Sequence, residues 1–404
     1  MKEKTILHSD VNNFFASVEC STNPNLLGKP VAVTGNPEKR TGIILAKNEL
    51  AKKYGVKTGE AIWQAKQKCP DLVTVGPHYA LYEKISKEIQ ELYLEYTDLI
   101  EPMGLDECWL DITPSLKYLN KTGKEVADEL RSRIKEKFGI TVSVGVSFSK
   151  LFAKLGSDLK KPDATTEITR ENFKERTYHL PLNSIIGIGR KNTQKFEKMN
   201  VVTIGDFVSL NESFVTDIMG KPGKELHQKL RGDASEDVES YYNPAPPKSI
   251  GNGTTTVVDI KSREDIEKVV AFLCEKIANR MENGNYLGSC VSFAIKTNDF
   301  KTTSHSKAVP AMRSNEDIFK QSMFLIDEFW KYDKPIRSIR IQVSNLQPIS
   351  HTEQLSFLTE ETNNLNKSIQ SIKDKYGSNK IYLASDTYSF INRKNEDEDR
   401  PENH

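Results

Sequence analysis

A short proline-rich segment at residues 243–248, Asn-Pro-Ala-Pro-Pro-Lys, interrupts this chain of 404 residues. Proline fixes one backbone dihedral and has no amide hydrogen, so the segment predicts a stiff, extended connection rather than part of a helix or sheet. A chain of this length also exceeds what one hydrophobic core can organise. The sequence therefore predicts two to four folded domains, with a linker over residues 239–248.

The chain before the linker changes its pattern once. Up to about residue 167, apolar strands alternate with amphipathic helices. Residues 4–9 predict a buried strand, and a strand at 141–148 leads through Ser149, a residue type that caps helices, into a helix at 150–159. Residues 168–238 are all-helical in pattern. The sequence thus predicts an α+β domain followed by a helical one.

The chain after the linker returns to strands. Residues 249–348 surround two helical patterns, at about 263–283 and 314–331, which predicts a second α+β domain. Beyond Pro348 the sequence is polar and ends in an acidic run. Such a composition buries too little apolar surface to fold, so residues 349–404 predict a flexible tail.

The composition is typical of a soluble protein, with 37% hydrophobic and 28% charged residues and a net charge of +1. A nucleic-acid surface would have to come from local clusters of basic residues. We expect a cytoplasmic protein without a membrane partner, because no signal peptide or membrane-spanning apolar stretch is visible. The cysteines lack zinc-ligand spacing and predict free thiols in a reducing compartment: Cys20, Cys69, Cys108, Cys274 and Cys290.

Three carboxylates at the ends of two apolar runs indicate the chemistry. Asp10 ends the first strand, and the pair Asp106-Glu107 follows Ile-Glu-Pro-Met-Gly-Leu. Three acids brought to one point repel each other unless cations neutralise them. Oxygen ligands are those that Mg²⁺ prefers. The sequence therefore predicts a divalent-metal site.

The adjacent pair sets a geometric condition on that site. Neighbouring residues on a regular strand point to opposite faces, so Asp106 and Glu107 share a metal only if their strand begins with a distortion. We expect a hairpin turn at Pro102-Met103-Gly104 to supply it. For either acid alone, a solvated hairpin residue is the simpler interpretation. Two metals held by such acids would serve in-line attack at phosphorus.

Two longer motifs point to a family. Asp10-Val-Asn-Asn-Phe-Phe-Ala-Ser-Val-Glu19 and Gly104-Leu-Asp-Glu-Cys-Trp-Leu-Asp111 resemble the signature motifs of Y-family translesion DNA polymerases. The chain looks most like the bacterial DinB/UmuC group, which is DNA polymerase IV-like, over about residues 4–350. The resemblance implies an α+β multidomain, right-hand polymerase. It assigns a palm to 1–20 and 78–167, fingers to 21–77, a helix-hairpin-helix thumb to 168–238 and a little finger to 249–348.

Carried over by position, the resemblance implies roles for the acidic residues and their neighbours. Asp10 and Asp106 match the ligands of two Mg²⁺ ions, for which Mn²⁺ can substitute. Val11 matches a residue that lends its backbone carbonyl, and Glu107 the third catalytic carboxylate. Phe15 matches an aromatic steric gate against a ribose 2′-OH.

The nucleotide-binding residues implied by the resemblance include Phe14 beside the gate, and one phenylalanine of the pair is expected to pack inward. Lys161 matches the lysine that reaches the triphosphate, with Lys160 as a close competitor. Glu49-Leu-Ala-Lys52 departs from the usual Tyr-x-Ala-Arg of the family. Lys52 keeps the charge without the bidentate fork, and Glu49 adds an acid near the expected triphosphate.

Two basic segments are candidates for DNA binding. Gly187 and Gly189 precede a helix that begins with Arg190 and Lys191, which looks like a helix-hairpin-helix motif; a plain helix turn is an equal alternative from these residues alone. In the last domain, Lys296 and Lys301 lie on a strand pair with few acids and match a DNA-backbone clamp. By itself such a set of lysines is more often a solvated face.

The implied partners are primer-template DNA, dNTPs and the sliding clamp. The clamp-binding peptide would be Gln354-Leu355-Ser-Phe357-Leu358, an extended segment with apolar anchors. The implied activity is error-prone, template-directed DNA synthesis at damaged sites by a monomer. Two alternatives stay open: a non-catalytic clamp-binding accessory protein, against which the intact acids argue, and a two-metal nuclease, which needs neither gate nor thumb.

Overall fold

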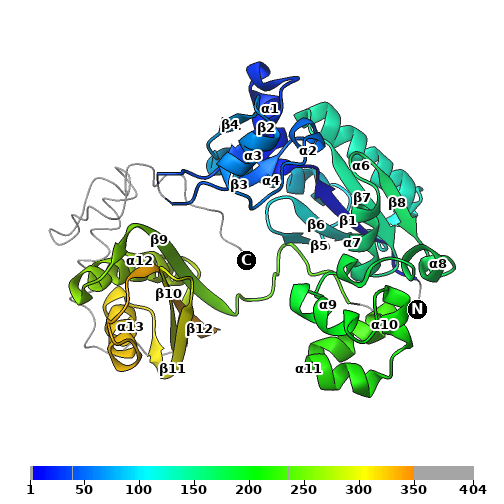
Figure 1. The fold of residues 1–404 in the computed structure, drawn as a ribbon. Helices are drawn as coiled ribbons and strands as arrows, with labels where there is room; N and C mark the ends of the chain where they lie inside the picture. Colours follow the sequence, from blue (N-terminus) through cyan, green and yellow to red (C-terminus); the bar gives the residue numbers. More distant parts are fainter. Residues whose placement is uncertain (1–2, 39, 235, 350–404) are drawn as a thin grey trace. The chain divides into compact units, whose positions relative to one another are not determined.

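The computed structural model describes residues 3–38, 40–234 and 236–349 (Figure 1). They divide into two compact units. The first contains the chain up to Gly35 together with Ile43–Ala245, and the second contains Asn36–Gly42 together with the chain from Pro246. None of the helices in the described part of the chain is long and apolar enough to cross a membrane.

The first unit is built on a five-stranded sheet with the order β5-β6-β1-β7-β8. Its central strand β1 is antiparallel to both β6 and β7, and β7 is parallel to β8. The first strand of the chain therefore lies in the middle of the sheet, where both of its edges are hydrogen-bonded. The strands are β1 (Ile6–Val11), β5 (Ile100–Met103), β6 (Glu107–Asp111), β7 (Val142–Ser147) and β8 (Thr165–Ile168).

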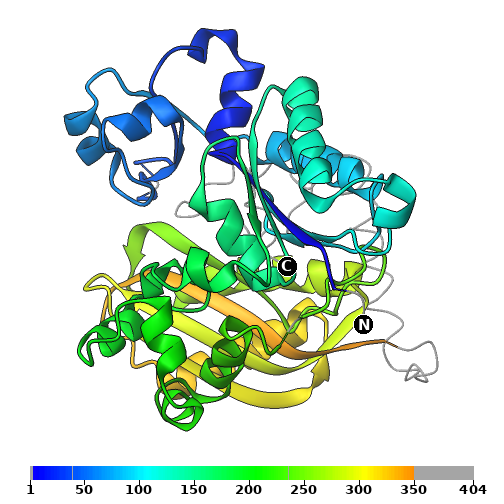
Figure 2. The same cartoon turned by 90° about the vertical axis from the view of Figure 1, so that its right-hand side faces the viewer.

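Helices cover both faces of this sheet (Figure 2). On one face, Leu7 and Leu110 belong to a core shared with α1 (Phe14–Thr22), α4 (Tyr79–Leu94) and α6 (Gly123–Phe138). On the other face, Ile6 and Trp109 pack with Ala153 of α7 (Lys150–Leu159). The alternation of strand side chains thus directs the even-numbered residues of β1 toward α7. A short helix α5 (Leu116–Leu119) precedes α6.

Helix α7 approaches the sheet unusually closely at Gly145. A Cβ atom at this position would lie 1.9 Å from the backbone oxygen of Ala153 and 2.5 Å from the amide nitrogen of Ser157. Only glycine fits between strand β7 and the helix. The predicted cap is confirmed, because the Ser149 side chain accepts a hydrogen bond from the Phe152 amide where α7 begins.

A small three-stranded sheet with its own core follows α1 in sequence. Its order is β3-β2-β4, and Ala32, Ile44 and Leu72 belong to the buried cluster beneath it. The short parallel strand β4 was not predicted. The elements are η1 (Pro24–Leu26), β2 (Val31–Thr34), β3 (Ile44–Lys47), α2 (Glu49–Lys53), α3 (Ile62–Lys68) and β4 (Val73–Val75).

The predicted helical region is confirmed from Phe173 onward. Its core contains Phe196 and Phe207, whose rings meet edge to face at 5.2 Å. Gly220 has a left-handed φ of 67° and kinks the last helix just before Pro222. The elements are α8 (Phe173–Thr177), η2 (Leu182–Ser184), α9 (Arg190–Glu197), α10 (Ile204–Ser209) and α11 (Glu212–Leu230).

The second unit is an antiparallel four-stranded sheet, order β11-β10-β12-β9, with two helices packed on one shared core. Ser262 and Ser314 cap these helices with their side chains, so both predicted helices are confirmed. The elements are β9 (Ser249–Ile260), α12 (Arg263–Asn283), β10 (Tyr286–Thr297), β11 (Thr302–Met312), α13 (Asn315–Phe329) and β12 (Ile336–Pro348).

Candidate active site

The central sheet places two of the three predicted catalytic carboxylates opposite each other. Asp10, near the end of β1, pairs in register with Glu107, the first residue of β6. Cross-strand partners project to the same face of a sheet. Here that face is the one covered by α7, and the Asp10 side chain is buried beneath it.

Asp106 lies in the turn before β6 and not on the strand itself. The turn spans residues 104–106 and has Gly104 at φ 76°. The Val11 amide donates a hydrogen bond of 2.8 Å to the backbone oxygen of Asp106, which ties the turn to the end of β1. Pro102 and Met103 belong to β5, so the predicted turn position is wrong. The required distortion exists because the pair straddles the boundary between turn and strand.

Two lysines from α7 and the residues after it reach these acids. The Nζ of Lys161 lies 2.6 Å from Oδ2 of Asp10, and the Nζ of Lys154 lies 2.7 Å from Oε2 of Glu107 and 3.7 Å from Asp10. Lys161, and not Lys160, therefore makes the contact. Sequence reasoning missed Lys154, because Lys161 lies beyond the end of α7 and helical spacing does not connect the two lysines.

The acids differ in their pKa values because their neighbours differ. Burial raises the pKa of Asp10 despite the opposing effect of Lys161. Burial, followed by repulsion from Asp10 and Glu107, raises the pKa of Asp106 to about 6. Burial would also raise the pKa of Glu107, but hydrogen bonds with His8 and Lys154 outweigh it and lower the value to about 2. Asp106 is therefore the acid whose charge is least compensated.

The charges around the three acids determine whether a metal ion would be stabilised there. In the described part of the chain, no three His, Cys, Asp or Glu side chains already form a metal-ligand group. Lysine ammonium groups offset Asp10 and Glu107, whereas no ion pair is found for Asp106 among the described residues. The carboxylate oxygens are nevertheless the donor type that Mg²⁺ takes, and the raised pKa values mark negative charge that a cation would stabilise.

The two phenylalanines after β1 have different surroundings. Phe14 is buried, at 3% exposure, in the core beneath the sheet, whereas Phe15 is half-buried. The ring of Phe15 stacks on Tyr82 at 4.4 Å and 13°, and meets Tyr79 edge to face. The expectation that one of the pair packs inward is confirmed for Phe14. Phe15 keeps an exposed ring portion, which a gate against a sugar requires.

The basic helix of the small sheet is connected to the same region. The Asn13 side chain donates a hydrogen bond of 2.9 Å to Oε1 of Glu49, and Lys52 Nζ lies 3.4 Å from the same oxygen. Asn13 stands between Asp10 and Phe15 in sequence. Glu49 therefore contacts the residue that precedes α1, and it partly offsets the charge of Lys52.

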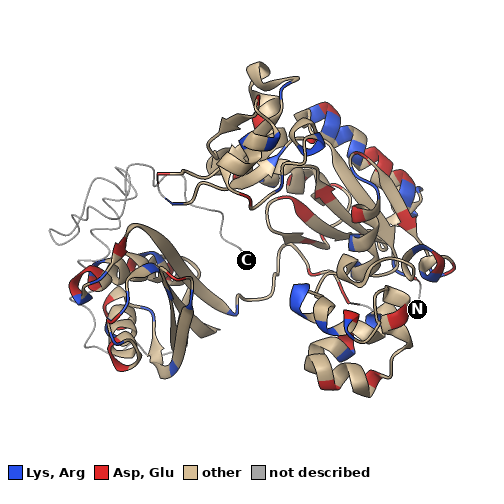
Figure 3. Ribbon diagram, in the orientation of Figure 1, with Lys and Arg blue, Asp and Glu red and all other residues tan. Residues whose placement is uncertain are grey.

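The predicted glycine turn before α9 has the expected form. Ile185 and Ile188 are buried, while Gly187 and Gly189 between and after them are exposed. Gly187 has a φ of 95°, which favours glycine, and Gly189 caps α9 without a side-chain hydrogen bond. The first turn of α9 then carries Arg190 and Lys191, which are exposed. Figure 3 shows Lys and Arg positions in blue on the ribbon of this region.

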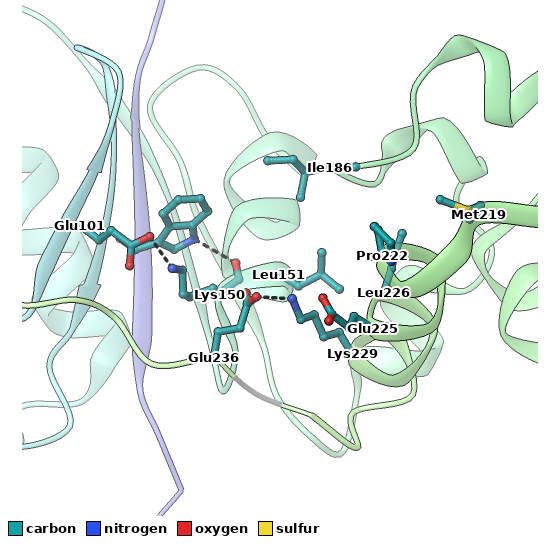
Figure 4. Close-up of a pocket in the computed structure, with 12 residues that line it drawn as sticks. Glu101, Lys150, Leu151, Ile186, Met219, Pro222, Glu225, Leu226, Lys229 and Glu236 are labelled. Carbon is teal, nitrogen blue, oxygen red and sulfur yellow. Dashed lines mark hydrogen bonds and ion pairs between the residues drawn. The ribbon is translucent and has the colours of Figure 1, made fainter. Parts of the chain in front are cut away.

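A hollow of about 310 Å³ lies between α7 and the kinked helix α11 (Figure 4). Its charged groups are paired: Lys150 contacts Glu101 at 2.5 Å, and Lys229 contacts Glu236. It shares Gly187 with the glycine turn, but none of the predicted catalytic carboxylates lines it. The hollow is therefore separate from the acidic site.

Of the two lysines predicted on a strand pair in the second unit, one lies on a strand and the other lies in the turn between strands, 3.7 Å from Asp299. The Nζ of Lys296 on β10 lies 4.9 Å from the ring centre of Phe300, and Lys301 in the following turn is largely exposed. Both project from the β10–β11 hairpin. The predicted clamp-binding residues Gln354, Leu355, Phe357 and Leu358 lie outside the described residues.

Comparisons with known proteins agree on one family. A model described as the impB/mucB/samB family matches residues 9–158, and the C-terminal domain of that family matches residues 247–357. A DNA polymerase IV of Acetivibrio thermocellus is 39% identical over 381 residues, covering 93% of this chain and 95% of that protein. A DNA polymerase IV of Alkaliphilus oremlandii is 33% identical, covering 93% and 97%.

Solved structures share the fold. A Y-family DNA polymerase chimera of Dbh and Dpo4 superposes with a TM-score of 0.75, at 27% identity, over 85% of this chain and all of that one. An insertion ternary complex of Dbh DNA polymerase gives a TM-score of 0.62 with the same identity and coverage. The right-hand polymerase fold and template-directed translesion synthesis predicted from the motifs are confirmed, and no finding favours a non-catalytic accessory protein. This chain belongs to the Y-family of translesion DNA polymerases, in the DinB-type group of DNA polymerase IV.

Proposed function

We propose that this polymerase adds dNTPs to a primer 3′-OH at a site made by Asp10, Asp106 and Glu107. Y-family polymerases generally use divalent metal ions. In this chain the three carboxylates and the backbone carbonyl of Val11 would hold two Mg²⁺ ions, or Mn²⁺ in their place. The pairing of Asp10 with Glu107, beside the turn that carries Asp106, is the observation that supports this most. The bound metals would lower the pKa of the attacking hydroxyl and steady the leaving group.

The two lysines serve as internal counter-ions until nucleotide arrives. Lys161 and Lys154 lie within 2.7 Å of Asp10 and Glu107, respectively, and offset their charges. In the proposed complex Lys161 would act as a point charge on the triphosphate. Lys52 contributes a second positive charge from α2.

The nucleotide lies against Phe15 in this proposal, with Phe14 fixing the helix behind it. Phe15 has little freedom to retreat because its ring is stacked on Tyr82 and backed by Tyr79. A ribose 2′-OH would need space that the ring already fills. Phe15 thus selects deoxyribose by shape.

Duplex DNA is held mainly through its phosphates. The exposed amides at Gly187 and Gly189, with Arg190 and Lys191, form one phosphate contact region, and Lys296 and Lys301 add another. Each neutralised phosphate adds about 0.9 to the slope of binding against salt. The domain roles proposed are palm for 1–20 and 78–167, fingers for 21–77, thumb for 168–238, linker for 239–248 and little finger for 249–348.

The polymerase is proposed to act as a monomer in the cytoplasm. All five cysteines are free thiols, which fits a reducing compartment. Primer extension with labelled primer separates the candidate functions: a polymerase lengthens the product, a nuclease shortens it, and an accessory protein leaves it unchanged. Shortened or unchanged product would contradict the proposal.

We predict that Mg²⁺ raises the melting temperature more at pH 7.5 than at pH 5.5. The folded pKa of Asp106 is raised to about 6, so its contribution favours the folded state at low pH and is lost as pH rises through that value. Mg²⁺ should restore this contribution to folding stability only at pH values at which Asp106 is ionised. In differential scanning fluorimetry, each kcal/mol of added folding stability should raise the melting temperature by about 2–4 °C. Asp106→Asn is the control and should reduce the difference between pH values, leaving the part due to Asp10, whose pKa is also raised by burial. Equal shifts in the wild type at both pH values would contradict the prediction.

We also predict that truncation after residue 352 leaves basal synthesis intact and removes stimulation by the sliding clamp. The peptide 354–358 would insert its apolar side chains into a groove of the clamp. Primer extension with and without loaded clamp is the measurement. A full-length variant with Leu355, Phe357 and Leu358 changed to alanine is the matched control and should behave like the truncation. Undiminished stimulation of both would exclude this peptide.

A further inference from the structure

A buried set of side chains lies behind Glu107 and has no part in the mechanism above. His8 on β1 is completely buried, and its Nδ1 lies 2.8 Å from the hydroxyl oxygen of Ser157 on α7. Its Nε2 lies 3.4 Å from Oε2 of Glu107, close enough for an ion pair, and has no hydrogen bond of good geometry within the described structure. Residues from β1, α7 and β6 therefore form a series that ends at a catalytic carboxylate.

The position of His8 follows from the strand geometry. His8 precedes Asp10 by two residues, so both side chains project toward α7. Its cross-strand partner on β6 is Trp109, whose ring meets the imidazole edge to face at 5.0 Å. The imidazole is thus held by Trp109 on one side and by Ser157 at one nitrogen. Its orientation leaves the other nitrogen directed at Glu107.

The hydrogen-bonding capacity of these groups limits where the proton can be. An ionised Glu107 only accepts hydrogen bonds, so a favourable contact with His8 requires the hydrogen on Nε2. In a neutral ring Nδ1 is then an acceptor. The Ser157 hydroxyl also lies 2.8 Å from the backbone oxygen of Lys154, so in this arrangement its one hydrogen turns from that oxygen to Nδ1. The ring is completely buried, and burial favours its neutral form over a charged one.

We propose that His8 and Ser157 are positioning residues for Glu107. The Ser157 hydroxyl fixes the imidazole through Nδ1, and the Nε2–H donates to Oε2 of Glu107. This contact persists when Lys154 is displaced from the same oxygen, so Glu107 keeps its orientation as cations and substrates exchange. Outer contacts of this kind typically change metal affinity or activity by about 10- to 100-fold. The inference rests on the proposed role of Glu107.

The first test is the protonation of the two ring nitrogens in the metal-free, full-length protein. ¹⁵N NMR of histidine-labelled protein should show hydrogen on Nε2 of His8 and none on Nδ1, with the signals assigned by their loss in His8→Gln. Ser157→Ala should increase the fraction of rings protonated at Nδ1. A wild-type ring without hydrogen on Nε2 would overturn the proposal, since no donor would then face Glu107.

The second test separates positioning from stability by single-nucleotide kinetics. Ser157→Ala should lower the maximal rate by about 10- to 100-fold, while the KM for dNTP stays within about twofold. His8→Phe should lose at least as much. His8→Gln should regain part of the rate, because its amide N–H can stand in for Nε2–H.

The matched control is Ser147→Ala on β7. Ser147 is also buried and donates one hydrogen bond, of 2.7 Å, to the backbone oxygen of Ile168. Its loss should leave the maximal rate unchanged. Equal rate losses in Ser147→Ala and Ser157→Ala would overturn the positioning role. Full activity of Glu107→Gln would instead refute the proposed function of Glu107, whereas the NMR result would still report the contact itself.

Discussion

Asp106→Asn should lower the rate of nucleotide incorporation by about 10³-fold or more, with little change in DNA binding. Asparagine keeps the size of the side chain but removes the negative charge that would hold a cation. Stabilisation of the transition state by bound metal is worth several kcal/mol, and each 1.4 kcal/mol corresponds to about tenfold in rate. Pre-steady-state incorporation of one dNTP measures the rate, and fluorescence anisotropy of labelled primer-template measures binding.

Asp128→Asn is the matched control for that experiment. Asp128 lies on α6 and pairs with Lys124 and Arg131, away from the acidic site. Removing its charge should change the rate by no more than about twofold, because partly exposed pairs contribute little energy. A loss of less than tenfold in Asp106→Asn would show that Asp106 does not hold a metal needed for the reaction.

Phe15→Ala should admit ribonucleotides, reducing the preference for dNTP over rNTP by about 5- to 150-fold. Steric overlap with a packed side chain costs about 1–3 kcal/mol, and this penalty should disappear with the ring. Incorporation of dNTPs should continue, because Phe15 carries no group that takes part in the chemistry. The measurement is the ratio of kcat/KM for matched dNTP and rNTP in primer extension. An unchanged ratio would show that Phe15 is not the steric gate.

Phe14→Ala distinguishes the gate from its neighbour. Phe14 is 3% exposed and belongs to the core beneath the sheet. Truncating such a side chain typically costs about 3–5 kcal/mol of folding stability. This variant should therefore melt at a lower temperature while keeping its sugar selectivity. If Phe14→Ala lost sugar selectivity and Phe15→Ala lost only stability, Phe14 would be the gate and Phe15 the core residue.

The sequence was sufficient to predict the acids and most of the framework around them. Asp10 could be placed because an apolar strand precedes it, and α7 because Ser149 caps it. These features are local: strand period, cap chemistry and motif spacing depend on residues close together in sequence. The same reasoning predicted the two helices of the second unit from their amphipathic pattern.

The contacts that tune the acids depend on tertiary packing and were not predicted. His8 sits within an apolar strand and gives no local sign of a polar role, because its partner Ser157 is 149 residues away. Lys154 meets Glu107 only because α7 crosses the face of the sheet that carries both β1 and β6 acids. The turn position was misplaced because Pro102 is compatible with the edge strand β5, a position that proline tolerates.

Gly145 determines how closely α7 packs against the sheet and therefore how far the α7 residues lie from the strand acids. With 1.9 Å between a hypothetical Cβ and the Ala153 oxygen, any larger residue would push α7 outward as one piece. Lys154 and Ser157 lie on that helix, and Lys161 follows it, so a single added methyl group would withdraw all three from the strand acids together. Gly145, which has no functional side chain, thus sets the distance between these α7 residues and the acids on the strands. Variation at Gly145 should be tolerated less than at many residues nearer the substrate.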